Sequence, residues 1–182
     1  MGNPLNLTSN LFFFIFTLIL LYVAYTFPKL QVEPKQTNLL FYVHDHFTGE
    51  HTTAVTVAGA NGHTSNILHF GTMAIVDDPI TEGPSRDSTL IGRAQGMYVN
   101  SQLDGKAVFM AFSVVFTTGE YEGSTLEIQG YDLYSAKERE FGVVSGTGYF
   151  RFVKGHGFIE TEFMDLVTLR AILKLNVTVK HY

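Results

Sequence analysis

The sequence contains no cysteine, so neither a disulfide bond nor a thiolate metal site can form. It also lacks any run of Lys or Arg, and its formal net charge is −5. Because nucleic-acid binding requires clustered positive charge, we expect no nucleic-acid partner. Helix-length amphipathic segments are scarce too: the best, residues 162–174, is short and fits strand periodicity equally well. The chain therefore depends on its own apolar core for stability.

The longest apolar run is near the N-terminus, where residues 11–27 read LFFFIFTLILLYVAYTF and no charged residue precedes them. A run of this length lies between the core of a signal peptide and a short membrane anchor. Ala24 and Thr26 suit the −3 and −1 positions of a cleavage site. We therefore expect residues 1–27 to be a signal peptide, with an uncleaved anchor as the alternative. The polar residues 28–38 are predicted to be a linker.

The remaining residues, 39–182, read as one strand after another, separated by turn pairs such as Asn61-Gly62 and Asp104-Gly105. The last segment alternates apolar and polar residues most cleanly, as a half-buried strand does. About eight such strands suggest a barrel or a sandwich, and eight strands are about what closes a barrel around one small ligand. Closure also removes exposed sheet edges. We predict an all-β domain, an eight-stranded antiparallel up-and-down β-barrel. The expected strands are residues 39–48, 52–58, 67–77, 90–100, 107–118, 124–131, 142–162 (two strands, or one bent at its glycines) and 169–182.

The first predicted strand carries a carboxylate among apolar residues. Alternation places Asp45 on the same face as Phe41, Val43 and Phe47. If that face lines the barrel interior, burial raises the pKa of Asp45 and suits it to proton transfer. The alternative is that Asp45 lies near the strand end and caps the following turn.

The segment Leu90 to Tyr98 places Gly92, Ala94, Gly96 and Tyr98 on one face. Small residues along a strand leave space beside it, and Tyr98 offers a phenol at the edge of that space. The alternative is that these glycines allow a barrel strand to coil. Both interpretations can hold together.

Two further sets of charged residues flank turns. Asp132 and Arg139 bracket a polar stretch and can pair at a barrel mouth or hold a substrate hydroxyl; an exposed pair, worth little in stability, is the alternative. Asp77 and Asp78 precede Pro79 at an expected strand–turn junction, where carboxylates usually accept backbone N–H groups. We interpret these two as structural.

His44 and His46 share the second face of the first strand, an arrangement that can bind a metal. No acidic or thiol partner has ligand spacing nearby, so we expect solvated histidines and neither a metal nor another cofactor. No nucleophile elbow and no Ser-His-Asp set is found. An N-glycosylation sequon begins at Asn176, on the polar face of the last strand, and we expect a glycan there.

Several segments, in order, resemble the plant dirigent proteins over nearly the whole of residues 39–182. The segments are LLFYVHD (39–45), FGTMAIVDDPITEGP (70–84), IGRAQGMYV (91–99), FTTGEYEGSTLEIQG (116–130), REFGVVSGTGYFRFVKG (139–155) and the terminal VKHY. The resemblance implies an eight-stranded barrel, a homo-oligomer (a trimer expected, a dimer possible) and secretion to the plant apoplast or cell wall. It also implies a phenolic small molecule as ligand and no cofactor.

The function that the resemblance implies is stereoselective coupling of phenoxy radicals. The radicals come from monolignols such as coniferyl alcohol, a separate laccase or peroxidase generates them, and the products are lignans. One alternative is a lyase or cyclase that acts through a quinone methide, as pterocarpan synthases do. A third is a scaffold that binds phenolics in the cell wall. The first and third are not enzymes in the usual sense, whereas the second is.

Carried over by position, Asp45, Asp132 and Arg139 are the expected catalytic residues of the pocket, and Tyr98 is expected to bind the substrate with them. Phe41 and Phe47, on the face of Asp45, complete the expected substrate-binding set. The sequence lacks the cysteine pair usual in lignan-forming members and has Ser145 where a GGTG motif has Gly. Its VAGANG (57–62) and DDPITEGP (77–84) segments are closer to the larger branch that also includes the pterocarpan-forming members.

Overall fold

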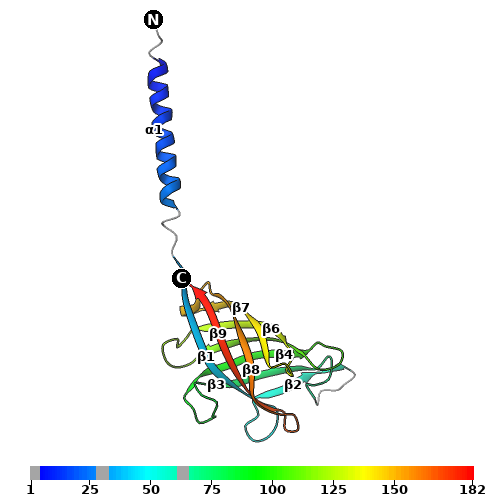
Figure 1. The fold of residues 1–182 in the computed structure, drawn as a ribbon. Coiled ribbons are helices and arrows are strands. Elements are labelled where there is room, and N and C mark those ends of the chain that lie inside the picture. Colours follow the sequence, from blue (N-terminus) through cyan, green and yellow to red (C-terminus); the bar gives the residue numbers. More distant parts are fainter. Residues whose placement is uncertain (1–4, 28–32, 61–65) are drawn as a thin grey trace. The chain divides into compact units, whose positions relative to one another are not determined.

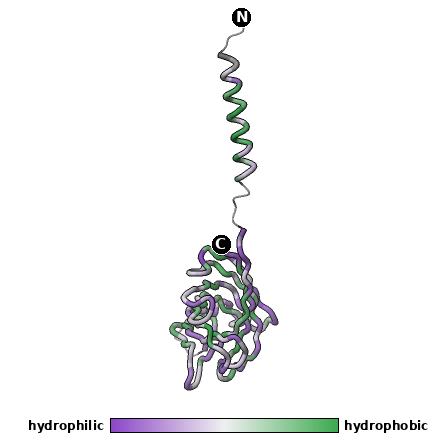
Figure 2. The backbone as a smooth tube through the Cα atoms, turned by 90° about the vertical axis from the view of Figure 1, so that its left-hand side faces the viewer, coloured by the Kyte–Doolittle hydropathy of each residue, from purple (hydrophilic) through white to green (hydrophobic). Residues whose placement is uncertain are grey.

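The computed structural model describes residues 5–27, 33–60 and 66–182, which form two compact units, an N-terminal helix and a barrel. The predicted turn at Asn61-Gly62 and residues 28–32 of the predicted linker lie outside the described residues. The helix, α1, spans Leu5–Thr26. Its sequence is mostly apolar and contains no Gly or Pro, and Figure 2 shows hydrophobic residues along most of the helix. The part Thr8–Thr26 is long and apolar enough to cross a membrane, a test that a signal sequence passes equally.

The barrel is one continuous antiparallel sheet in the described part of the chain (Figure 1). Its strand order is β1-β9-β8-β7-β6-β5-β4-β3-β2, so neighbours along the chain are mostly neighbours in the sheet. The strands are β1 (Lys35–His46), β2 (Ala54–Ala58), β3 (Met73–Thr81), β4 (Leu90–Asn100), β5 (Val108–Phe116), β6 (Thr125–Asp132), β7 (Glu138–Thr147), β8 (Lys154–Asp165) and β9 (Arg170–His181).

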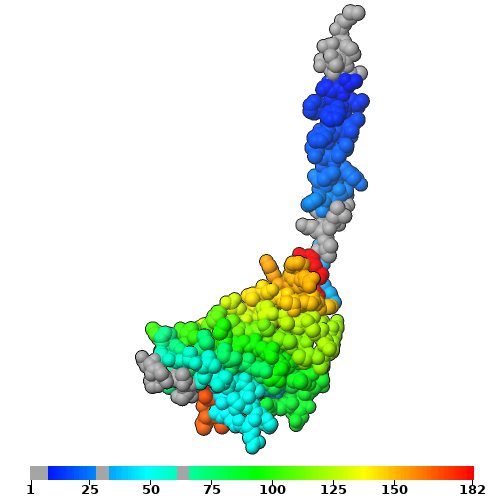
Figure 3. Space-filling model, turned by 180° about the vertical axis from the view of Figure 1, so that it is seen from behind, coloured from blue at the N-terminus to red at the C-terminus, as the bar shows by residue number. Residues whose placement is uncertain are grey.

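Strand β1 closes the sheet on both sides. It pairs with β9 along its whole length, from Lys35↔His181 to His46↔Arg170. On its other edge it pairs with β3 at Tyr42↔Thr81 and Val43↔Ile80. The predicted eight-stranded antiparallel barrel is therefore confirmed, with β2 added outside it as a further strand on β3. Figure 3 shows the opposite face, where β3 to β6 form a continuous wall.

The predicted ranges were wrong for the third strand and for the start of the first strand, whereas the two-strand alternative for residues 142–162 is confirmed. The third strand is Met73–Thr81 and not residues 67–77, so it runs through Pro79. On this edge β3 pairs with β2 as far as Ala54↔Val76 and with β1 from Val43↔Ile80 onward. Pro79 lies between these two pairings, where no neighbouring strand requires a backbone N–H from it, so the proline is tolerated. Residues 142–162 belong to two strands, β7 and β8, separated by the short 3-10 helix η3 (Gly148–Phe150). Strand β1 begins at Lys35, inside the segment expected as a linker.

The core fills the part of the barrel near the N-terminal end of β1. Alternate residues of each strand point inward, as the pleat requires. The fully buried side chains include Phe41, Leu126, Phe150, Leu175 and Val177. Large side chains fill this part, and the open space that the described residues enclose lies near the end of β1 that carries Asp45.

Candidate functional site

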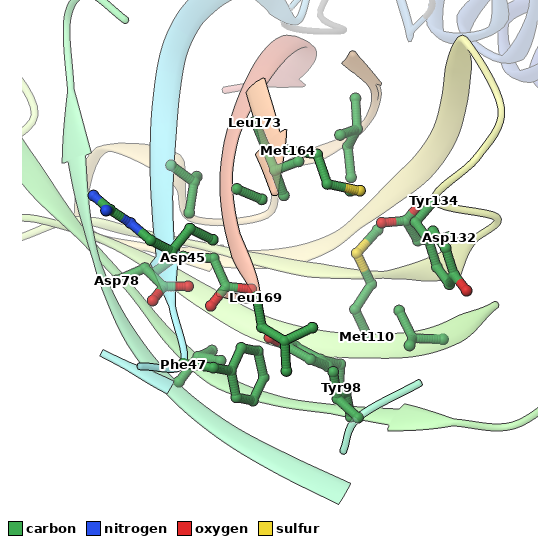
Figure 4. A pocket seen from close by; sticks show the side chains of 18 of the residues that line it. Asp45, Phe47, Asp78, Tyr98, Met110, Asp132, Tyr134, Met164, Leu169 and Leu173 are labelled. Carbon is green, nitrogen blue, oxygen red and sulfur yellow. The ribbon is translucent and has the colours of Figure 1, made fainter. Parts of the chain in front are cut away.

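A cavity of about 120 Å³ lies inside the barrel, and all eight strands of the closed sheet contribute residues to it (Figure 4). Most of the lining is apolar, with Val43, Met110, Ile159, Leu173 and Leu175 on its walls. The polar groups in it are therefore few and weakly hydrated. The polar or aromatic lining residues of interest are Asp45, Phe47, Asp78, Tyr98, Asp132, Tyr134 and Arg139.

Asp45 and Tyr98 form a direct pair in this cavity. The Tyr98 hydroxyl donates to Asp45 Oδ2 at 2.6 Å, and Asp45 Oδ1 is buried without a partner among the described residues. Asp45 faces the cavity and is otherwise surrounded by protein. Burial raises its pKa from 3.8 to about 6, and the hydrogen bond from Tyr98 opposes part of that rise. The inward-facing prediction for Asp45 is confirmed, and the turn-capping alternative is wrong.

Phe47 follows β1 and packs its ring edge-on against Tyr98, with 5.9 Å between ring centroids. It lines the cavity as the sequence suggested. Phe41 does not. Its side chain is 1% exposed and belongs to the packed core deeper in the barrel, so the prediction that it lines the pocket was wrong. The inward face of β1 thus changes from core at Phe41 to cavity at Asp45.

Asp78 is a second acid in the cavity that the sequence analysis had assigned a structural role. It is 3% exposed, and its Oδ1 accepts a hydrogen bond of 2.5 Å from Thr53. Figure 4 shows the carboxyl groups of Asp45 and Asp78 side by side. Burial raises the pKa of Asp78 well above its ordinary value, and the neighbouring charge of Asp45 raises it further. Extending the strand through Pro79 would have revealed it, since Val76, Asp78 and Ile80 share the inward face.

Asp132 and Arg139 form a buried ion pair, with 2.8 Å between Arg139 Nε and Asp132 Oδ1. Their side chains are 8% and 3% exposed, so the exposed-pair alternative was wrong. Burial raises the pKa of Asp132 more than the charge of Arg139 lowers it. Arg139 Nη1 donates to Thr161 Oγ1 at 2.8 Å and to the Ala136 carbonyl, whereas its Nη2 is buried without a partner in the described structure.

The cavity therefore has two polar ends. Asp132 and Tyr134 lie across the cavity from Asp45 and Asp78 (Figure 4). One end holds two carboxyl groups that favour a proton, and the other holds a guanidinium with an unused N–H donor. An aromatic molecule with oxygen at both ends matches this arrangement, because its rings fit the apolar walls and its oxygens meet these groups.

The two histidines of β1 lie on the outer face but are not solvated, which corrects the prediction. His44 Nε2 is 2.7 Å from Thr81 Oγ1, and Arg86 Nη1 donates to His46 Nδ1 at 3.3 Å. Burial and the charge of Arg86 lower the pKa of both histidines, for His46 to about 4. Within the described residues, no three His, Asp or Glu side chains gather as a metal site. Asn176 is exposed on the outer face of β9, so it is open to modification.

Comparison with known proteins gives one family. The model of that family, described as Dirigent-like protein, matches residues 36–180. Dirigent protein 1 of Arabidopsis thaliana is 42% identical over 147 residues, covering 81% of this chain and 80% of the relative. Pterocarpan synthase 1 of Glycyrrhiza echinata is 39% identical over 151 residues, covering 82% and 80%. The solved structure of the pterocarpan synthase dirigent protein PsPTS1 matches with a TM-score of 0.78 and 41% identity, covering 84% of this chain and 99% of that one.

Proposed function

The chain belongs to the dirigent protein family, and from this premise we propose that it converts a phenolic benzylic alcohol, through a quinone methide, into a cyclic ether of one handedness. The carboxyl pair Asp45 and Asp78 in an apolar cavity is the observation that carries the proposal. The similarity to two proteins named as pterocarpan synthases supports it. The reaction needs an acid, a base and a fixed ring orientation, and the cavity offers all three.

Asp78 is the acid of the first step. Burial and the neighbouring charge of Asp45 raise the pKa of Asp78 well above its ordinary value and so favour its protonated form, which can give a proton to the benzylic hydroxyl of the substrate. The benzylic C–O bond breaks and water leaves. The phenolic hydroxyl on the same ring loses its proton to water, its electrons move through the ring toward the benzylic carbon, and its oxygen becomes the carbonyl oxygen of the quinone methide.

Arg139 is suited to hold that phenolic oxygen. Its Nη2 has no partner among the described residues, and it lies in the group of polar residues across the cavity from the acids. A fixed N–H donor aimed at an oxygen on which charge develops stabilises the transition state without reorganisation. Asp132 holds the guanidinium in place through its bond to Nε.

Asp45 is the base of the second step. A second phenolic hydroxyl of the substrate adds to the methide carbon, and Asp45 takes the proton it releases. Its pKa of about 6 leaves it ionised near neutral pH. The carbonyl oxygen regains a proton from water as the ring becomes aromatic again, and Asp45 passes its proton to the neighbouring Asp78. Both acids then return to their starting states, and the net change is the loss of one water molecule. In this proposal the cavity walls hold the methide in one pose, so that closure takes place from one face and the product has one handedness.

The test is turnover of an isoflavanol carrying a second phenolic hydroxyl, without any oxidant, followed by chiral chromatography. We expect one enantiomer from the wild-type protein and a loss of about 100-fold or more in Asp45→Asn and Asp78→Asn, since general acid–base groups contribute on that order. Glu160→Gln, on the barrel surface and 3.6 Å from Lys174, is the matched control and keeps full activity. Full activity in Asp45→Asn would reject the proposal.

A second candidate is stereoselective coupling of phenoxy radicals from monolignols such as coniferyl alcohol. The two polar ends of one apolar cavity favour it, because each can hold the oxygen of one phenolic unit. Incubating coniferyl alcohol with laccase, with and without the protein, tests it. An optically active lignan would support coupling. A racemic product together with tight binding of the phenol would point to a binding scaffold.

A further inference from the structure

Thr53 links the two strands that carry the acids at a place where these strands do not pair directly. It lies just before β2 and outside the cavity. Its N–H donates to the carbonyl of His46 at 2.8 Å, and its carbonyl accepts from the N–H of Asp77 at 2.9 Å. The backbone of Thr53 therefore fastens the end of β1 to the middle of β3.

The Thr53 hydroxyl has a single proton and two neighbouring acceptors. Asp78 Oδ1 is at 2.5 Å and the carbonyl of His44 is at 3.4 Å. The same hydroxyl oxygen accepts from the N–H of His46 at 3.1 Å, which fixes its lone pairs. The distances place the hydroxyl proton on the bond to Asp78, because hydrogen bonds between oxygens weaken sharply beyond 3 Å.

Each of the two acids thus accepts a hydrogen bond from one hydroxyl group. Tyr98 donates to Oδ2 of Asp45, and Thr53 donates to Oδ1 of Asp78. A carboxyl oxygen that accepts such a bond is a poor place for a proton, so the exchangeable proton of Asp78 resides on Oδ2. A hydrogen bond donated to a carboxylate also favours its charged form.

We propose that Thr53 is a positioning residue for the acid pair: its hydroxyl directs the proton of Asp78 to Oδ2 and limits how tightly Asp78 holds it. The use of this proton in catalysis rests on the proposed function, whereas the placement of the proton does not. Without the hydroxyl, Asp78 keeps its proton to higher pH. Tyr98 has the corresponding effect on Asp45 alone.

The experiment is a pH titration of the Asp45 and Asp78 carboxyl carbons by NMR on ¹³C-labelled protein, with assignments from Asp45→Asn and Asp78→Asn. The Thr53→Val variant is isosteric and lacks the hydroxyl. We expect it to move the titration step that is lost in Asp78→Asn upward by about one pH unit or more, the size expected when a hydrogen bond to a charged group is lost. Thr53→Ser is expected to restore the wild-type step. Thr118→Val removes a threonine hydroxyl that donates to the carbonyl of Leu90 on the protein surface and is the matched control.

Unchanged steps in a folded Thr53→Val protein would overturn the proposal, and so would equal shifts in Thr53→Val and Thr53→Ser. If Thr53→Val does not fold, the proposal is tested on the wild-type protein alone. The Thr53 hydroxyl proton is then expected as a slowly exchanging resonance that moves with the Asp78 step, and its absence counts against the proposal. These readouts need no substrate. A wild-type protein that fails to convert the isoflavanol would therefore reject the proposed function and leave the placement of the proton to be judged separately.

Discussion

Replacing Asp45 by Asn is expected to change how the stability of the barrel depends on pH. The pKa of Asp45 rises from 3.8 to about 6 on folding, chiefly through burial. Between these pH values the folded protein keeps a proton that the unfolded chain releases. The stability that the neutral carboxyl contributes is therefore complete below about pH 4 and is lost as the pH rises through about 6. Asn at this position does not titrate.

The size of the effect follows from that difference. A rise of about 2 pH units, at 1.36 kcal/mol per unit, gives about 3 kcal/mol as an upper value, since water in the cavity screens part of the charge. His46 acts in the opposite direction over the same range, because its pKa falls from 6.5 to about 4. The two effects cancel in part in the wild-type protein. Only the difference between wild type and variant isolates Asp45.

The assay is urea unfolding of the barrel, wild type and Asp45→Asn, at several pH values from about 4 to 7. We expect the variant to gain stability relative to the wild type by up to about 3 kcal/mol across this range. An amide nitrogen left without a partner at the Oδ1 position adds a constant cost of about 1–3 kcal/mol, which does not depend on pH. Removing the charge of Asp45 also lowers the pKa of Asp78, which acts in the same direction as the main effect.

A difference in unfolding free energy that stays constant from about pH 4 to pH 7 would refute the reasoning. It would mean that Asp45 ionises in the barrel as easily as in the unfolded chain. If Asp45→Asn is more stable than the wild type but does not turn over substrate, the charge of Asp45 is needed for activity and lowers the stability of the barrel.

Three further predictions concern other residues. Tyr98→Phe removes the hydrogen bond to Asp45 and raises the pKa of that carboxyl above about 6, so the acidic limb of the pH–rate profile should move up by about one unit; an unmoved limb would contradict the assignment of Asp45 as base. Asp132→Asn leaves the buried Arg139 unpaired and should cost about 3 kcal/mol in urea unfolding, against less than about 1 for the surface variant Glu160→Gln. Asn176→Gln should lower the mass of the protein expressed in plant cells by one glycan, and an unchanged mass would show that the sequon is not used.

The strand pattern was readable from the sequence because alternation reports directly on which face is buried. The last strand shows this best: Leu175, Val177 and Val179 are buried, and Asn176 is exposed. Local alternation also placed Asp45 on an inward face. What it could not give was depth along the barrel axis. Phe41 and Phe47 share that face, yet one lies in packed core and the other in the cavity, and only the three-dimensional closure distinguishes them.

Asp78 was missed for a different reason. The sequence Asp77-Asp78-Pro79 has the composition of a turn, and local preference is a weak guide where tertiary pairing overrides it. The strand continues because it changes partner at this point, from β2 to β1, which is a contact between segments far apart in the chain. The buried histidines have the same origin, since their partners are far from them in the sequence: Thr81 is the last residue of β3 and Arg86 lies in the loop that follows it.

Strand β1 pairs with β9 on one edge and with β3 on the other, and this affects the order in which the barrel can form during synthesis. Neighbouring strands from β2 to β9 join in sequence order, so most of the sheet forms from hairpins as the chain emerges. Strand β1, made first, must wait for β9, made last, to complete its longest pairing. A nascent chain therefore carries Asp45 on a strand with an unpaired edge and has no enclosed cavity.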